Sequence, residues 1–165
     1  QRGDVIVFRD DNGTAALRDN KNLIKRVIAV PGDRIELRED RLYINGELVE
    51  RVFEEARTYR ANDNLRRLHP SALYTETLPG GVAHAIYERD AGGDFETYRE
   101  RIVPEGHVFV MGDNRDRSID GRSPSLGFVP FSQVIGRAET VIFTTANCAE
   151  EPDVYCPTGR IWRGL

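Results

Sequence analysis

The sequence has 165 residues, of which 39% are hydrophobic and 30% charged, a composition typical of one globular core with or without a small appended lobe. A formal net charge of -4 disfavours nucleic acid and anionic lipid as partners. No stretch reaches the roughly 18 consecutive apolar residues that a membrane helix needs.

The N-terminal segment leads directly into the first predicted strand. It reads QRGDVIVFR, and neither a signal peptide nor another targeting segment is visible in it. A natural protein normally begins with methionine. Gln1 is therefore interpreted as the start of a fragment, with further sequence missing upstream.

Runs of alternating apolar and β-branched residues predict strands along much of the chain. Turn signals rich in glycine, asparagine and proline separate these runs, as expected for hairpins. The fold is therefore predicted to be mainly β and antiparallel. The predicted strands cover residues 5–9, 23–30, 34–37, 41–44, 82–87, 107–111 and 134–143.

The density of apolar residues divides the chain into an outer core and an inserted middle. Apolar residues are most frequent in 3–53 and 102–145, whereas the middle of the chain is more polar and rich in glycine. Residues 54–68 have mixed charge and only weak periodicity, so no helix is assigned to them. The predicted units are a discontinuous sheet or barrel-like antiparallel core at 1–53 and 102–147, a smaller β-rich lobe at 54–101, and a C-terminal tail at 148–165.

The tail contains the two cysteines of the chain, Cys148 and Cys156, among turn-forming residues. They are predicted to close a small disulfide loop, which implies an oxidising compartment. The alternative is a pair of unlinked thiols. Neither the cysteine spacing nor the three scattered histidines form a recognisable zinc ligand set, so no metal or other cofactor is predicted.

A lysine lies inside the apolar run Leu-Ile-Lys-Arg-Val-Ile-Ala-Val at 23–30. Alternation places Lys25 on one face with Leu23, Val27 and Ala29. Desolvation among such neighbours lowers the pKa of an amine, which could make Lys25 a general base. Alternatively, its stem packs on the sheet while the ammonium group reaches water. Arginine supplies 21 of the 23 Lys and Arg residues, and because arginine cannot be deprotonated, the presence of a lysine here adds a little weight to the base while both interpretations stay open.

A polar turn at 112–122, GDNRDRSIDGR, follows the apolar strand at 107–111. Its three aspartates and three arginines could neutralise one another in a solvated loop. The functional interpretation places the turn beside the lysine strand. Ser118 would then hydrogen-bond the Lys25 amine, and Asp120 would pair with Arg122 to hold the turn in place.

These segments resemble the conserved boxes of bacterial type I signal peptidases, also called leader peptidases. LIKRVIAVPGD resembles the lysine box, RGDVIVF the strand before it, and MGDNRDRSIDGR followed by GFVP the signature loop, all in the order of the family. The similarity covers roughly 1–50 and 79–145 and is closest to Gram-negative versions. No motif of the family is recognised in the middle or in the cysteine tail.

The resemblance implies a Ser/Lys endopeptidase, anchored in the inner membrane through a missing N-terminal segment, with its catalytic domain facing the periplasm. It would remove the signal peptides of exported preproteins without a cofactor. Lys25 would be the base, Ser118 would orient it, Asp120 and Arg122 would brace the loop, and Arg26 would support the strand. The positions that match the family's substrate cleft are Val7, Leu23, Ile24 and Ile119.

The sequence departs from the family pattern in three places. The nucleophile of the family lies in a Ser-x-x-Pro box upstream of the RGD strand, and this chain does not contain that box. Gly121 stands where the family often has serine, and the link at 123–126 is longer than usual. The chain as given is therefore predicted to be inactive, while the pairing of Asp120 with Arg122 is expected to survive both changes.

Two other functions remain open from the sequence. The chain could be a non-catalytic β domain that binds extended peptides. It could also belong to a self-cleaving repressor-type protease, which uses the same Ser/Lys chemistry in the cytoplasm. The GDNRD loop and the cysteine pair speak against the repressor. The sequence gives no prediction of the oligomeric state.

Overall fold

The computed structural model describes residues 1–11, 22–60, 68–89, 96–141 and 163–164. The predicted disulfide between Cys148 and Cys156 lies outside the described residues.

The strand that carries Lys25 lies in the middle of an antiparallel sheet. The sheet order is β11-β10-β2-β1-β12, so β2 lies between β1 and β10. β1 and β2 belong to the first segment that resembles the signal peptidases, residues 1–50, and β10 belongs to the second, residues 79–145. The strands of this sheet are β1 (Val5–Arg9), β2 (Asn22–Ala29), β10 (His107–Met111), β11 (Val129–Pro130) and β12 (Val134–Ala138).

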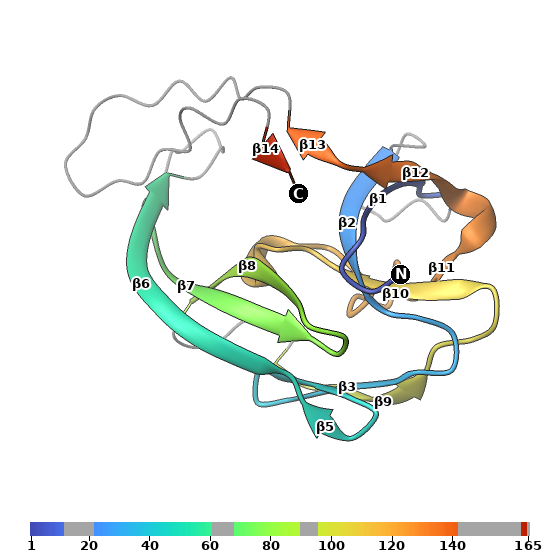
Figure 1. Cartoon of the computed structure of the whole chain (residues 1–165), viewed down its shortest axis with the longest axis horizontal. Coiled ribbons are helices and arrows are strands. Elements are labelled where there is room, and N and C mark those ends of the chain that lie inside the picture. Colours follow the sequence, from blue (N-terminus) through green and yellow to red (C-terminus); the bar gives the residue numbers. More distant parts are fainter. Residues whose placement is uncertain (12–21, 61–67, 90–95, 142–162, 165) are drawn as a thin grey trace.

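Three further sheets complete the described part of the chain, with strand orders β5-β4-β3-β9, β6-β7-β8 and β13-β14. The β6–β8 sheet lies on one side of the molecule, away from β12 (Figure 1). Among the described residues, no helix is long and apolar enough to cross a membrane. The remaining elements are β3 (Arg34–Arg38), β4 (Arg41–Ile44), β5 (Glu47–Leu48), β6 (Glu50–Arg60), β7 (Leu68–Leu78), β8 (Val82–Glu88), β9 (Tyr98–Ile102), β13 (Thr140–Val141), β14 (Arg163–Gly164) and the short 3-10 helices Arg115–Arg117 and Phe131–Gln133.

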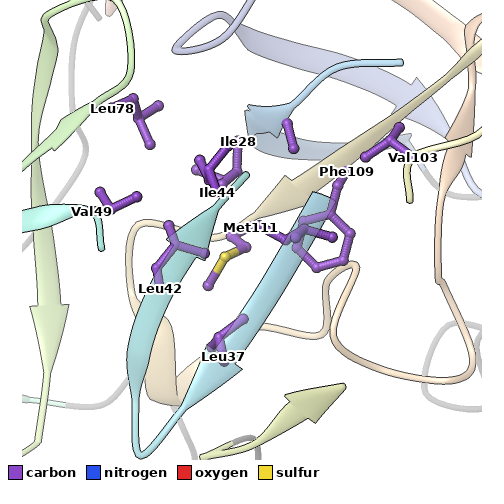
Figure 2. Close-up of a cluster of buried hydrophobic side chains, with 11 residues drawn as sticks. Ile28, Leu37, Leu42, Ile44, Val49, Leu78, Val103, Phe109 and Met111 are labelled. Atoms are coloured by element: carbon purple, nitrogen blue, oxygen red, sulfur yellow. The ribbon is translucent and has the colours of Figure 1, made fainter. Parts of the chain in front are cut away.

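The five-stranded sheet separates two apolar clusters. One cluster joins β2 and β10 to the β3–β4 hairpin and reaches Leu78 at the end of β7 (Figure 2). The other lies on the opposite side of the sheet and contains Phe8 and Val110. Because both faces of β2 pack against apolar side chains, burial fixes this strand firmly at its C-terminal half.

A bulge in β2 changes which of its residues share a face. Ala29 pairs with Phe109 of β10, whereas the next residue of β10, Val110, already pairs with Val27. One extra residue, Ile28, therefore lies on β2 at this point. Ala29 packs in the first cluster and Val27 in the second. The expectation that Ala29 shares a face with Lys25 is wrong, because simple alternation does not continue through the bulge.

The prediction of a mainly antiparallel β fold is confirmed, and the inserted middle contains more strand than the sequence indicated. β6 and β7 are 11 residues long each and pair with one another, although the mixed charge of residues 54–68 gave no clear pattern. β9, which was not among the predicted strands and crosses the predicted boundary between residues 101 and 102, pairs with β3. The predicted strand at 134–143 is interrupted between β12 and β13, and its last two residues lie outside the described part.

Candidate active site

Lys25 lies where β2 loses one of its two neighbouring strands. On one side it pairs with Ile6 of β1. On the other side, the pairing of β10 with β2 ends at Met111 and Arg26, so Lys25 has no partner on β10. Burial lowers the pKa of the Lys25 amine below its usual range; Arg122 acts in the same direction, and Asp120 and Asp113 oppose it. The predicted low-pKa environment is therefore present.

The polar turn leaves the sheet beside Lys25 and forms one wall of a cavity of about 280 Å³. Both Lys25 and Ser118 line this cavity, so the structure brings the two predicted residues together. The remaining lining residues are Val5, Ile24, Arg26, Gly112, Asp113, Asn114 and Arg117.

The predicted hydrogen bond between Lys25 and Ser118 is not formed in this structure. The Ser118 hydroxyl is buried and has no hydrogen-bond partner among the described residues. It packs against the first residue of the turn, where a Cβ added to Gly112 would lie 2.1 Å from Ser118 Oγ. A glycine at 112 is thus required for this approach. The serine is held at the cavity by packing, with its hydroxyl still available for a partner.

Asp120 and Arg122 form the ion pair expected at the end of the turn. Arg122 Nε donates to Asp120 Oδ1 at 2.9 Å and Arg122 Nη2 to Oδ2 at 2.8 Å. Asp120 is fully buried and also accepts the backbone N–H of Gly112 at 3.0 Å. Arg122 Nη2 donates in addition to the carbonyl of Arg115 at 2.5 Å. The pair therefore ties the end of the turn to its beginning and its middle.

Arg26, the residue after Lys25, connects three segments of the chain. Its Nε and Nη2 each donate at 2.9 Å to the Asp113 carboxylate, and its Nη1 donates at 2.8 Å to the carbonyl of Gly3. Arg26 is buried, whereas the Asp113 side chain is 43% exposed. The expected supporting role of Arg26 thus has a definite partner, Asp113, which the sequence did not identify.

Gly121, where the sequence departs from the family pattern, has surroundings that leave no room for a side chain. A Cβ at this position would lie 2.7 Å from the ring of Phe109 and 2.9 Å from the carbonyl of Val110. The backbone N–H of Gly121 donates to the same carbonyl at 2.9 Å. The turn therefore packs directly on β10 at this point, and the pairing of Asp120 with Arg122 is kept.

The four predicted substrate-cleft residues do not share one surface. Val7 and Ile24 are cross-strand partners on β1 and β2, and Ile24 is 55% exposed and lines the cavity. Ile119 is 38% exposed and directly follows Ser118 in the turn. Leu23 differs from expectation, since it packs against the second apolar cluster. Alternation along β2 turns Leu23 away from the face of Ile24.

The described residues include no group of three or more His, Cys, Asp or Glu side chains arranged to hold a metal ion. The cavity itself offers an amine with a lowered pKa and a buried hydroxyl, beside a braced polar turn.

Comparison with known proteins connects this arrangement to a family. The family model of signal peptidase, peptidase S26, matches residues 1–143. The chain belongs to this signal peptidase family. The resemblance seen in the sequence boxes is thereby confirmed, and the match extends across the inserted middle.

Two curated relatives carry the name Signal peptidase I. They come from Rickettsia akari (strain Hartford) and Rickettsia typhi (strain ATCC VR-144 / Wilmington), and each is 38% identical over 88% of this chain. The chain spans about half the length of these signal peptidases, 52% and 53% respectively. A solved signal peptidase I from Enterococcus faecalis V583 is 29% identical, with a TM-score of 0.45, over 84% of this chain and 95% of its own.

Proposed function

We propose that the protein, at its natural full length, is an endopeptidase that removes signal peptides from exported preproteins at the outer face of the inner membrane. One observation carries this proposal: a lysine amine with a lowered pKa lines the same cavity as a buried, unpartnered serine hydroxyl. Family membership and the name of the relatives support the peptidase over a repressor-type protease.

In this proposal Lys25 is the general base. Burial destabilises the ammonium form, so the neutral amine that can accept a proton is reached at a lower pH than for a solvated lysine. Asp120 and Arg122 act on Lys25 with opposite signs, which leaves burial as the largest influence on its pKa. Lys25 therefore lies next to the turn and can reach the neutral form that a general base needs.

Ser118 orients the lysine. A buried hydroxyl without a partner is destabilising by about 1–3 kcal/mol, so the nearest suitable group in the cavity gains from bonding to it. The neutral Lys25 amine can both donate and accept a hydrogen bond, and it lines the same cavity. A rotamer change of the lysine is the movement that would form this bond when a substrate closes the cavity.

The substrate is proposed to bind as an extended strand beside β2. Residues 22–25 pair with β1 on one side, and among the described residues no strand pairs with them on the other. A peptide added there would complete the sheet and bring its backbone to Lys25. Ile24, exposed at the cavity, would contact small apolar side chains near the cleavage point.

The chemical sequence follows from these roles. The neutral Lys25 amine takes the hydroxyl proton of a serine nucleophile, and the serine oxygen then attacks the scissile carbonyl carbon. The peptide C–N bond breaks as its nitrogen takes up a proton, and water hydrolyses the resulting acyl-enzyme. The Ser-x-x-Pro nucleophile of the family has no counterpart among the 165 residues. We therefore expect the chain by itself to leave a substrate uncut.

The test is cleavage of a preprotein with alanine before the cleavage site, by the protein at its natural length in detergent. Lys25→Arg should abolish cleavage, because the guanidinium group keeps its proton. Lys21→Arg, the same change at the other lysine of the chain, is the control and should leave the rate within about twofold.

Cleavage retained by Lys25→Arg would exclude Lys25 as the base. A wild-type protein that binds the preprotein but never cuts it would contradict the enzyme and favour a peptide-binding domain. In the active protein, the rate should rise with pH through a pKa below the usual value of 10.5, as the burial of Lys25 requires.

A further inference from the structure

The polar turn contains a second arginine, Arg115, whose partner lies in the inserted lobe. Arg115 Nη1 donates to Glu76 Oε1 at 2.9 Å, and Nη2 donates to Oε2 at 2.5 Å. Arg115 is 4% exposed and Glu76, on the central strand of the β6–β8 sheet, is 2% exposed. This is a buried, bidentate ion pair between the lobe and the turn.

The neighbouring strand β8 holds the same turn through the backbone. The N–H of Tyr87 donates to the carbonyl of Asp113 at 2.8 Å, and Tyr87 and Asn114 form a parallel β-bridge. Two residues further along, just after β8, the N–H of Arg89 donates to the carboxylate of Asp116. Successive residues of the turn are therefore attached to the lobe, and two of them, Asp113 and Asn114, also line the Lys25 cavity.

His84 also lies beside Glu76, but Arg115 is the residue that neutralises the Glu76 carboxylate. The His84 Nε2 lies 3.5 Å from Glu76 Oε2, on the strand position directly opposite. Burial lowers the pKa of His84 to about 4, with Arg26 and Arg115 acting in the same direction and Glu76 opposing them. The imidazole is thus neutral near pH 7, and Arg115 is the charged group bonded to the Glu76 carboxylate.

We propose that Glu76 is a positioning residue for the Lys25 site, acting through Arg115 on the turn that carries Ser118. Residues of the turn line the cavity together with Lys25, and the turn's Asp120 and Arg122 act on its amine, so a displaced turn would leave Lys25 more open to water. Removing Glu76 leaves a buried guanidinium group without its counter-charge, which favours movement of Arg115 towards solvent. In this proposal the inserted lobe helps to position the residues around Lys25.

The test reads the protonation of Lys25 directly. The 165-residue chain has two lysines, so a Lys21→Arg background leaves a single lysine side chain. In protein labelled with ¹³C-lysine, the NMR shift of the Lys25 Cε carbon gives its titration midpoint. Glu76→Gln should raise this midpoint by about one pH unit, because a displaced turn lets water reach the amine.

The sign of the shift separates positioning from direct electrostatics. Loss of a negative charge alone lowers the pKa of a nearby amine, whereas loss of burial raises it. A midpoint that stays unchanged or falls, with native chemical shifts elsewhere, would overturn the proposal. Asp33→Asn is the matched control, since Asp33 is also buried and paired with an arginine, Arg2, outside the turn. Its midpoint should match wild type.

Glu76→Asp covers the case in which Glu76→Gln does not fold. It keeps both buried charges but withdraws the carboxylate by one methylene, so the bidentate contact with Arg115 is weakened. It should raise the Lys25 midpoint in the same direction by a smaller amount. A folded Glu76→Asp variant with an unshifted midpoint would count against the proposal.

The consequence for activity rests on the proposed function and is measured separately in the full-length protein. Glu76→Gln should lower kcat about tenfold with KM kept within about twofold, and should move the rise of rate with pH to higher pH. If the wild-type protein does not cleave, the proposed function fails while the Lys25 titration still decides the role of Glu76. A Glu76→Gln variant with wild-type kcat and pH profile would overturn the positioning role.

Discussion

The two ends of the 112–122 turn are held in different ways. The end of the turn holds itself, because Asp120 bonds Arg122 and the N–H of Gly112 within a span of 11 residues. The beginning is held from outside, where Asp113 is bound by Arg26 on β2 and by the backbone of β8. The first type of contact is local in sequence, and the second crosses between sheets.

This difference determines how each end responds to change. At the self-held end both charges are buried, so the loss of one partner leaves the other in a medium of low polarity. At the beginning the Asp113 carboxylate is half open to water, which weakens its interaction with Arg26 and softens the effect of losing it.

The largest effect is expected for Asp120→Asn at the self-held end. The substitution leaves the Arg122 guanidinium buried without a counter-charge, which should lower the free energy of unfolding by about 3 kcal/mol. Urea unfolding followed by circular dichroism measures this change. A loss below about 1 kcal/mol would show that water or another group compensates Arg122, and that this end is no more firmly held than the other.

An intermediate effect on the free energy of unfolding is expected when the pH is lowered and His84 takes up a proton. His84 lies beside Glu76, which holds Arg115 of the turn. The pKa of His84 is about 4 in the folded protein and near 6.5 when unfolded, so the unfolded state binds more protons between these values. The contribution of the neutral His84 to the free energy of unfolding is fully present above pH 6.5 and declines as the pH falls towards 4. Between pH 7 and pH 5 the wild type should lose about 2 kcal/mol relative to His84→Gln.

The comparison with His84→Gln isolates the histidine from other titrating groups. Burial raises the pKa of Glu88 to about 6, which acts in the opposite direction, but Glu88 is present in both proteins and drops out of the difference. Parallel pH profiles for the two proteins would contradict the buried, neutral state of His84.

The smallest effect is expected for Asp113→Asn. The Asp113 side chain is 43% exposed and Arg26 retains its hydrogen bond to Gly3, so the free energy of unfolding should fall by only about 1 kcal/mol. The same urea titration measures it. A loss equal to that of Asp120→Asn would remove the distinction between the two ends of the turn.

The sequence predicted the core strands well, because their apolar and β-branched runs reflect burial: β3 and β4 alternate between more and less buried residues, and β10 is buried along nearly its whole length. It missed β6 and β7, because β6 carries charged side chains at both sets of alternate positions and neither strand has a clear apolar period. It also predicted no strand at β9, since the partner of β9 is β3, some 60 residues earlier, and no local pattern encodes that pairing. The bulge at Ile28 was equally hidden, because it depends on register with β10.

The candidate site divides in the same way. Lys25, Ser118, Asp120 and Arg122 were found because they lie in recognisable boxes, and the Asp120–Arg122 contact spans only two residues. Glu76 carried no signal, since a glutamate in a polar strand is normally solvated. Its burial arises only when β7 meets the turn 39 residues further along the chain. Contacts that depend on tertiary packing between distant segments could not be deduced from residue types.

The early end of β10 has a consequence for molecular recognition. Where β10 stops at Met111, residues 22–25 of β2 keep a row of backbone donors and acceptors on one side that no described strand uses. Every amino acid offers the same backbone groups to such a row. A peptide bound there would be recognised mainly through main-chain hydrogen bonds, so a single site could accept peptides of very different sequence. Selection by side chain would be confined to the few positions nearest Lys25.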